Sequence, residues 1–158
     1  PQLVSELPHS VLPGHTVFAL QHAHARCCSW LQLMQRENAI PLLNGDGLPW
    51  NWRLPEPIPW LTSEQTFRLN QPAERHLMQQ LVFAMDAIAQ TPDAAKTVLS
   101  AALNLSRALQ EMQRYCPSLQ DRSQVQLLFA RAGLVLATQR VLRLLLEDGL
   151  AIAAPPEL

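Results

Sequence analysis

The sequence of 158 residues has few charged residues and few cysteines, and each of these shortages excludes a class of protein. Charged residues make up 16% and hydrophobic residues 48%, so the chain is neither disordered nor strongly solvated. Its three cysteines, two of them adjacent, do not form the framework of a disulfide-rich secreted protein. We therefore expect a cytoplasmic protein. The net charge of −1 argues against avid, indiscriminate nucleic-acid binding.

Motifs for catalysis and metal binding are also missing from the sequence. There is no glycine-rich phosphate loop, no G-x-S-x-G elbow, and no H-E-x-x-H or C-x-x-C pair. His22 and His24 are two residues apart, which places them about 200° apart on a helix, so they cannot share a metal ion. We expect no enzyme activity, no cofactor and no metal.

Long apolar runs are absent too. None approaches the roughly 18 residues needed to cross a bilayer, and the longest near-miss, Ala132 to Leu146, is interrupted by polar and charged side chains. The N-terminus has no basic start followed by an apolar stretch, so no signal peptide is expected. Pro1 in place of Met suggests a start inside a longer product. We expect no membrane partner.

Four stretches have helical patterning, and no strand alternation is seen elsewhere. The first runs from about Val17 to Glu37 with Thr16 as its N-cap, and the second from about Ala73 to Ala89 with Pro72 in its first turn. The third opens at Thr91-Pro92-Asp93 and stops before Cys116-Pro117. The fourth runs from about Arg122 to Glu147, where Asp148-Gly149 ends it. We therefore predict a single all-α domain over residues 1–158, an antiparallel bundle of about four main helices.

The segment from about residue 40 to 63 is rich in proline and tryptophan, and this composition excludes a regular helix or a central strand. It contains Trp50, Trp52 and Trp60. Linkers seldom carry three tryptophans, so we expect an extended segment held across the helices by these rings. The alternative is a docking loop in which the three tryptophans bind a protein partner.

Basic residues gather in the second half of the chain. Between residues 96 and 143 there are seven basic side chains against two acidic ones, a local balance of +5. Eleven of the twelve basic residues in the chain are arginines. Arginine presents a planar fork that suits phosphate and stacks on bases. The pattern fits RNA contact as well as ordinary solvated helix faces.

The first helix carries two stripes of side chains. One is apolar and consists of Leu20, His24, Cys27, Leu31 and Met34. On this stripe His24 is expected to be a hydrogen-bonded core residue, and Cys27 to pack in the core. The second stripe consists of His22, Arg26, Ser29 and Arg36. It is either an ordinary exposed face or a surface that contacts phosphates through arginine and a base through histidine.

The segment Gln21-His22-Ala23-His24-Ala25-Arg26-Cys27-Cys28-Ser29 resembles the V-Q-Y-A-H-A-R-I-C-S-I signature of the DALR-type anticodon-binding domain of class I arginyl-tRNA synthetases. The stretch from Arg131 to Leu142 is similar to the last helix of that family, and the end of the chain, A-P-P-E-L, resembles its closing A-P-E-R-M. The Pro/Trp-rich segment looks like an insertion. Catalytic-domain motifs of the family are absent, and its third-helix aromatics are replaced by Ala101, Leu109, Met112 and Gln113.

The resemblance implies a helical bundle that binds a tRNA anticodon stem-loop or a similar RNA without catalysing a reaction. By position, His22 and Arg26 correspond to the family residues that approach anticodon bases. The full set of predicted RNA-binding residues is Gln21, His22, Arg26, Ser29, Arg36, Arg140 and Arg143. The alternative function is a repurposed protein–protein interaction module, which keeps the fold and docks a protein through the Pro/Trp-rich segment.

Overall fold

The computed structural model describes residues 12–43, 47–90, 94–116 and 124–158, and within these ranges the fold is all-α. Four long helices are present, with two short helical segments: α1 (Gly14–Arg36), η1 (Pro49–Asn51), α2 (Pro72–Ala89), α3 (Ala94–Tyr115), α4 (Val125–Leu144) and the π-helical turn η4 (Leu145–Gly149). The described ranges contain only two isolated β-bridges and no strand. The predicted all-α fold class is therefore confirmed.

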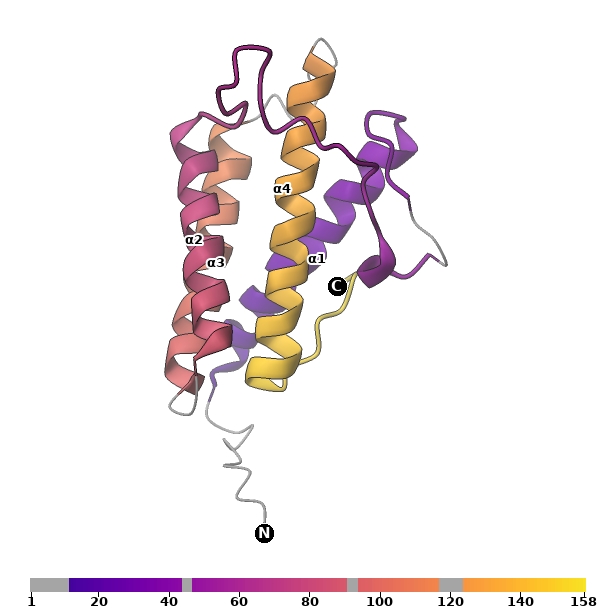
Figure 1. The fold of residues 1–158 in the computed structure, drawn as a ribbon. Helices are drawn as coiled ribbons and strands as arrows, with labels where there is room; N and C mark the ends of the chain where they lie inside the picture. The colour runs from indigo at the N-terminus through magenta and orange to yellow at the C-terminus, as the bar shows by residue number, and fades with distance from the viewer. Residues whose placement is uncertain (1–11, 44–46, 91–93, 117–123) are drawn as a thin grey trace.

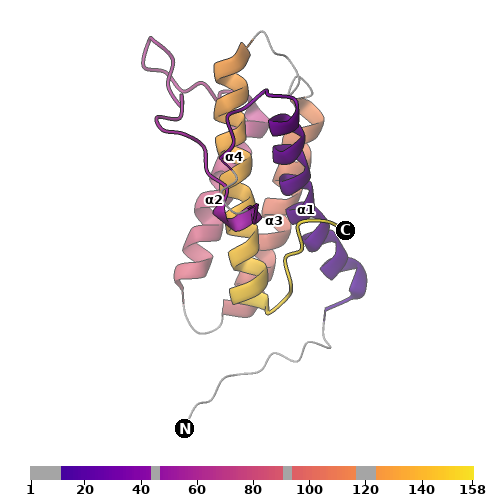
Figure 2. The ribbon, with the colours of Figure 1, turned by 90° about the vertical axis from the view of Figure 1, so that its right-hand side faces the viewer.

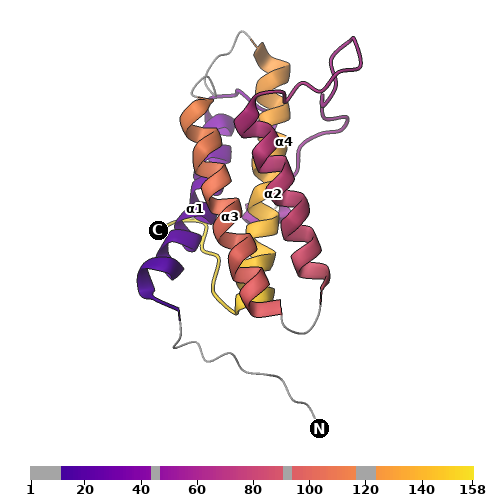
Figure 3. The same ribbon diagram turned by 90° about the vertical axis from the view of Figure 1, so that its left-hand side faces the viewer.

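The helices form a bundle in which chain neighbours run in opposite directions (Figure 1). α2 and α3 lie side by side as an antiparallel pair, α4 lies beside them, and α1 crosses the bundle obliquely against α4 and α3 (Figures 1 and 3). After α4 the C-terminal residues turn back and run along α1 (Figure 1). This return places the end of the chain against the helix that carries the predicted RNA-binding stripe.

The core is built from the predicted apolar stripe of α1, from most of α4, and from the inward faces of α2 and α3. Leu20, His24, Cys27, Leu31 and Met34 are each at most 1% exposed, as expected. The helical stretch Val125–Gly149 is long and apolar enough to cross a membrane, yet 67% of its most apolar window is buried inside the protein. Such burial is typical of the core helix of a soluble protein, where neighbouring helices cover the apolar side chains.

Two predicted helix starts had different outcomes. The N-cap prediction for Thr16 is wrong, because α1 begins at Gly14 and the capping position is Pro13, whose carbonyl oxygen accepts the backbone N–H of Thr16 at 2.9 Å. Pro72 opens α2, as predicted, and its fixed φ suits a first helical turn. The cap predicted at Thr91-Pro92-Asp93 lies outside the described residues, and α3 ends at Tyr115 as expected.

The last helix ends within one residue of the predicted Asp148-Gly149, since the backbone widens into η4 (Leu145–Gly149) and Leu150 is its C-cap. Ala151 then takes a left-handed conformation with φ 53°, and Ile152 N–H donates to the Leu146 carbonyl at 2.7 Å, which closes the helix end. Gly149 has a packing role, because a Cβ at this position would lie 2.6 Å from Val98 Cγ1 of α3.

The Pro/Trp-rich segment is extended and lies over α4, as predicted (Figure 2). Leu43 and Arg53 pair as an antiparallel bridge, which brings these two positions of the segment together. Trp52 is only 2% exposed and its carbonyl oxygen accepts a hydrogen bond from Arg140 Nη2. The docking hypothesis needed all three tryptophans to be accessible, so it is wrong for Trp52, whose ring belongs to the core. Trp50 and Trp60 keep 39% and 38% exposure.

Gly133 of α4 is a position where the Pro/Trp-rich segment approaches the bundle closely. A Cβ there would lie 2.6 Å from Cη2 of Trp60. We expect Gly133→Ala to displace the Trp60 ring and to lower the free energy of unfolding by about 1–3 kcal/mol, as overpacking does. Urea unfolding measures the loss, and tryptophan fluorescence reports the displacement. Gly14→Ala is the matched control, since nothing lies within 4 Å of a Cβ at that position. Equal stability of the two variants would contradict the contact.

Candidate nucleic-acid interface

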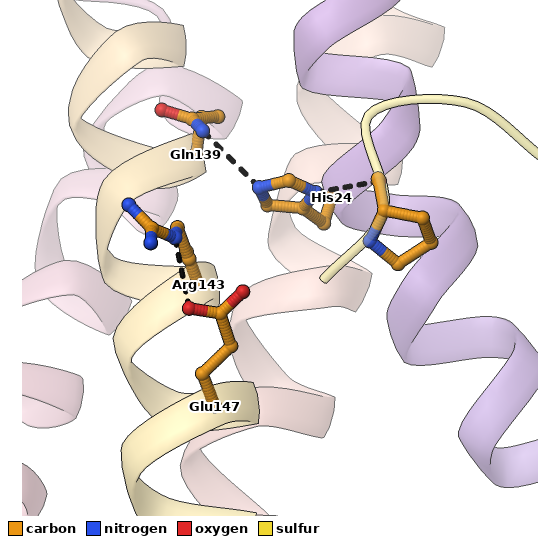
Figure 4. A network of polar contacts seen from close by, with 5 residues as sticks. His24, Gln139, Arg143 and Glu147 are labelled. Atoms are coloured by element: carbon orange, nitrogen blue, oxygen red, sulfur yellow. Dashed lines mark hydrogen bonds and ion pairs between the residues drawn. The ribbon is translucent and has the colours of Figure 1, made fainter. Parts of the chain in front are cut away.

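His24 is the centre of a buried polar network between α1, α4 and the C-terminal residues (Figure 4). Its Nδ1 lies 2.9 Å from the carbonyl oxygen of Pro155, so this nitrogen carries the proton and donates. Nε2 then accepts from the Gln139 side-chain amide at 3.1 Å. Burial lowers the pKa of His24, which stabilises this neutral tautomer. The prediction of a hydrogen-bonded core histidine is confirmed.

Gln21 extends the same attachment one turn earlier on α1. Its side-chain amide donates to the carbonyl of Ala153 at 3.1 Å. Together with His24, it fastens the returning C-terminal residues to α1. Two residues of the sequence signature, Gln21 and His24, therefore have an evident role in holding the tail. RNA contact by Gln21 stays a prediction.

Weakening of this network by acid is a testable consequence. The unfolded chain protonates His24 near its ordinary pKa of about 6.5, whereas the buried ring takes up a proton only at lower pH. The free energy of unfolding should thus fall as pH drops below about 6.5, by at most roughly 1.4 kcal/mol per pH unit until the folded-state pKa is reached. His24→Gln should remove this part of the slope, and His22→Gln should keep it. Identical slopes in both variants, measured by urea unfolding, would contradict the assignment.

The other predicted α1 residues lie on the exposed side of the helix. The ring of His22 stacks on Phe18, with centroids 5.7 Å apart and an interplanar angle of 16°. Phe18 is 57% exposed, so the pair presents an aromatic surface to solvent. Arg26, Ser29 and Arg36 are all exposed. The predicted second stripe is therefore accessible along its length.

Arg26 meets two arginines of α3 that the sequence prediction did not select. A groove of about 490 Å³ is lined by Arg26, Arg107, Gln110, Glu111, Gln113 and Arg114. Arg107 and Arg114 are seven residues apart, so they lie on one face of α3, and both are exposed. Three guanidinium groups against the single carboxylate of Glu111 give the groove a net positive charge. The spacing of the two arginines was visible in the sequence, but their approach to Arg26 depends on the packing of α1 against α3.

An aromatic side chain lies next to this groove. Tyr115, 68% exposed, lines a neighbouring groove of about 470 Å³ with His76 and Glu111. His76 Nε2 and Glu111 Oε2 are 3.9 Å apart. Glu111 lines both grooves, so the arginine groove is continuous with a surface that has an exposed phenol ring. Arginine side chains and an exposed aromatic ring are therefore adjacent on α1 and α3.

Arg140 and Arg143, also predicted to bind RNA, are not brought together with Arg26. They line a separate groove with Trp50 at the C-terminal end of α4. Nor does every arginine of the basic stretch 96–143 contribute to the surface. Arg131 is 4% exposed and forms a buried ion pair with Glu74 of α2. The local balance of +5 is therefore larger than the charge available to an external partner.

The cysteines have no reactive character in this fold. Cys27, Cys28 and Cys116 are all buried and free. Burial raises the pKa of the Cys27 thiol, and it raises the pKa of the Cys28 thiol to about 12, with the Gln139 side chain opposing the shift. Thiols with such pKa values are inert packing groups near neutral pH. Within the described part of the chain, no three His, Cys, Asp or Glu side chains are close enough to hold a metal ion.

A different kind of surface is found on α2. Four large apolar side chains are exposed on its second half: Val82 (61%), Phe83 (62%), Met85 (49%) and Ile88 (37%). Val82, Met85 and Ile88 are three residues apart and lie on one side of α2, whereas Phe83 points to another side and lines a groove with residues of α3. Exposed apolar side chains on one side of a helix mark contact surfaces more often than isolated ones do. This surface was not predicted from the sequence, where protein docking was expected at the tryptophans, because periodicity alone does not show which side of α2 is covered.

A helical bundle with an arginine groove and an exposed aromatic edge has the features of a binding domain for an anionic partner. The chain is 30% identical over 145 residues to an arginine–tRNA ligase of Gloeobacter violaceus (strain ATCC 29082 / PCC 7421). The match covers 87% of this chain and 22% of the ligase, so the chain spans about a fifth of its relative. No family model matches, and no solved structure matches.

Proposed function

We propose that this domain binds RNA, with the anticodon stem-loop of a tRNA as its ligand, and that it has no catalytic activity of its own. The observation that carries the proposal is the groove in which Arg26 of the α1 signature lies beside Arg107 and Arg114 of α3. Similarity to part of a protein that acts on tRNA supports the choice of ligand. The short length of the match, 22% of that ligase, supports a binding role without the chemistry of ligation.

The chemistry of the groove suits a folded RNA loop. Arginine forks bind phosphate oxygens in pairs, and unstacked bases stack on aromatic rings. Tyr115 and the His22–Phe18 pair supply such rings on α3 and α1. Ser29 and Arg36 continue the exposed stripe of α1. We propose that the phosphates lie along the arginines and that loop bases contact these rings.

A salt series tests the proposal. A fluorescent tRNA should bind at low salt and weaken steeply between 50 and 200 mM salt, because several phosphates release counterions when they are contacted. With three arginines in contact, the logarithm of the affinity should fall with the logarithm of salt with a slope of about −2 to −3. Absence of binding at 50 mM salt, or an affinity that does not depend on salt, would contradict the proposal.

The exposed apolar face of α2 favours protein docking as a second function. Val82, Met85 and Ile88, which lie on one side of the helix, would be covered by an apolar surface of a partner. If docking is the function, Val82→Asp abolishes capture of that partner and leaves tRNA binding unchanged. If RNA binding is the only function, Val82→Asp changes neither the proteins retained from lysate after nuclease treatment nor the affinity for tRNA.

A further inference from the structure

A third groove, of about 470 Å³, lies between η1 and the C-terminal end of α4, and the proposed function does not use it. Its charged and aromatic lining consists of Trp50, Arg53, Arg140, Arg143, Glu147 and Asp148. η1 lies on the side of α4 away from α2 and α3 (Figures 1 and 2). No residue of this groove lines the arginine groove between α1 and α3. It is therefore a separate site.

The three arginines of this groove differ in how many of their guanidinium N–H groups already have a partner. Arg143 Nε pairs with Glu147 Oε2 at 2.9 Å, which satisfies much of its charge (Figure 4). Arg140 donates to the carbonyl of Trp52 through Nη2 only, and its other N–H groups remain for a ligand. The guanidinium of Arg53, an exposed residue, has no hydrogen-bond partner among the described residues. Arg53 and Arg140 thus offer donors to an anion.

Trp50 gives the groove an aromatic surface of fixed orientation. The guanidinium of Arg143 lies 4.6 Å from the centroid of the ring, a cation–π contact that holds the indole against α4. The side chain is still 39% exposed, so part of the ring remains accessible to a second planar group. Asp148 adds an exposed carboxylate to the same lining, which can accept hydrogen bonds from hydroxyl groups.

We propose that this groove binds an unpaired ribonucleotide of an RNA strand. Arg53 and Arg140 bind its phosphate, the exposed part of Trp50 stacks on its base, and Asp148 accepts a hydrogen bond from the ribose 2′-hydroxyl. A simple anion would use the arginines and leave the indole and the carboxylate without a role. The 2′-hydroxyl also distinguishes RNA from DNA at such a site. This site and the α1/α3 groove are independent, and either can bind RNA without the other.

Fluorescein-labelled hexauridylate is the probe, and its binding to the whole protein is followed by fluorescence anisotropy at 50 mM salt. Trp50→Ala should weaken binding about fivefold or more, because base stacking on an aromatic side chain contributes on that scale. Arg53→Ala should weaken it about tenfold, because it removes a charge-assisted contact from an exposed residue. The deoxyuridine hexamer should bind several-fold more weakly than the ribose form.

Matched controls separate this site from its surroundings. Trp60→Ala removes a tryptophan of the same segment and similar exposure that does not line the groove, and it should leave the affinity unchanged. A variant with alanine at Arg107 and Arg114 should lose stem-loop binding and keep hexauridylate binding. Trp50→Ala can loosen η1 and so lower the affinity indirectly. Arg53→Ala is the second variant, because the exposed Arg53 side chain can be removed with less effect on the fold.

The proposal is overturned if hexauridylate does not bind, or if it binds equally well to Trp50→Ala, Arg53→Ala and the unchanged protein. It is also overturned if inorganic phosphate competes with hexauridylate as well as uridine monophosphate does, because a phosphate-only site has no use for the ring. Loss of hexauridylate binding in the Arg107 and Arg114 variant alone would place the strand in the α1/α3 groove and exclude this one. None of these outcomes depends on whether tRNA binds.

Discussion

Replacing Arg131 by methionine is expected to lower the free energy of unfolding by about 3–5 kcal/mol. Arg131 and Glu74 are 4% and 0% exposed, and Arg131 Nε lies 2.5 Å from Glu74 Oε1. Replacing Arg131 leaves the Glu74 carboxylate buried without a counter-charge, which costs more than the pair contributed. Small domains have stabilities of about 5–15 kcal/mol, so this single change removes a large fraction of the total.

Glu74 also makes a second hydrogen bond, which the control variant has to preserve. Its Oε2 accepts the backbone N–H of Gln71 at 3.0 Å and so caps the start of α2. The double variant Glu74→Gln, Arg131→Met removes both charges and keeps an oxygen for this N–H. We expect it to recover much of the loss seen in Arg131→Met. Arg75→Met, an exposed arginine next to Glu74 in sequence, should change stability by less than about 0.5 kcal/mol. Urea unfolding of the four proteins measures all of these values, and a loss below about 1 kcal/mol in Arg131→Met would contradict the buried pair.

Replacing Arg26, Arg107 and Arg114 together by alanine is expected to weaken tRNA binding about 100-fold or more at low salt. Each guanidinium removed takes away a charge-assisted contact to phosphate, and each should lower the salt slope by about 0.7–0.9. All three residues are exposed, so folding should be preserved. Arg75→Ala on α2 is the matched control, because it removes the same charge from a residue that lines none of the grooves described above. Equal loss in Arg75→Ala would mean that net charge, rather than this groove, determines the affinity.

The positions of helices could be predicted from the sequence where local features, such as a first-turn proline or an apolar stripe, determine them. Pro72 marks the start of α2, and the buried stripe of α1 follows its spacing of three and four. Where tertiary contacts decide, the role of a residue differs from the one that a local signal indicates. The last helix ends near Asp148-Gly149, but Gly149 allows the close approach of Val98, and the left-handed residue after the helix is Ala151.

The candidate site was only partly predictable for the same reason. Arg26 was selected from a local signature, whereas its groove also needs Arg107 and Arg114, which lie more than 80 residues later in the chain. The link between His24 and Pro155 spans 131 residues, so no local pattern indicates that the tail covers α1. From the sequence alone, the three tryptophans could not be distinguished from one another. The packing distinguishes them, because Trp52 enters the core and Trp50 and Trp60 stay partly exposed.

Cross-linking to a labelled anticodon stem-loop, followed by identification of the linked peptides, shows where RNA binds on the domain. We expect cross-links at low salt in the peptides with Arg26 and with Arg107 to Tyr115, and competing unlabelled stem-loop should remove them. Cross-links that avoid both peptides, or that persist in the variant with alanine at Arg26, Arg107 and Arg114, would contradict RNA binding at the groove between α1 and α3.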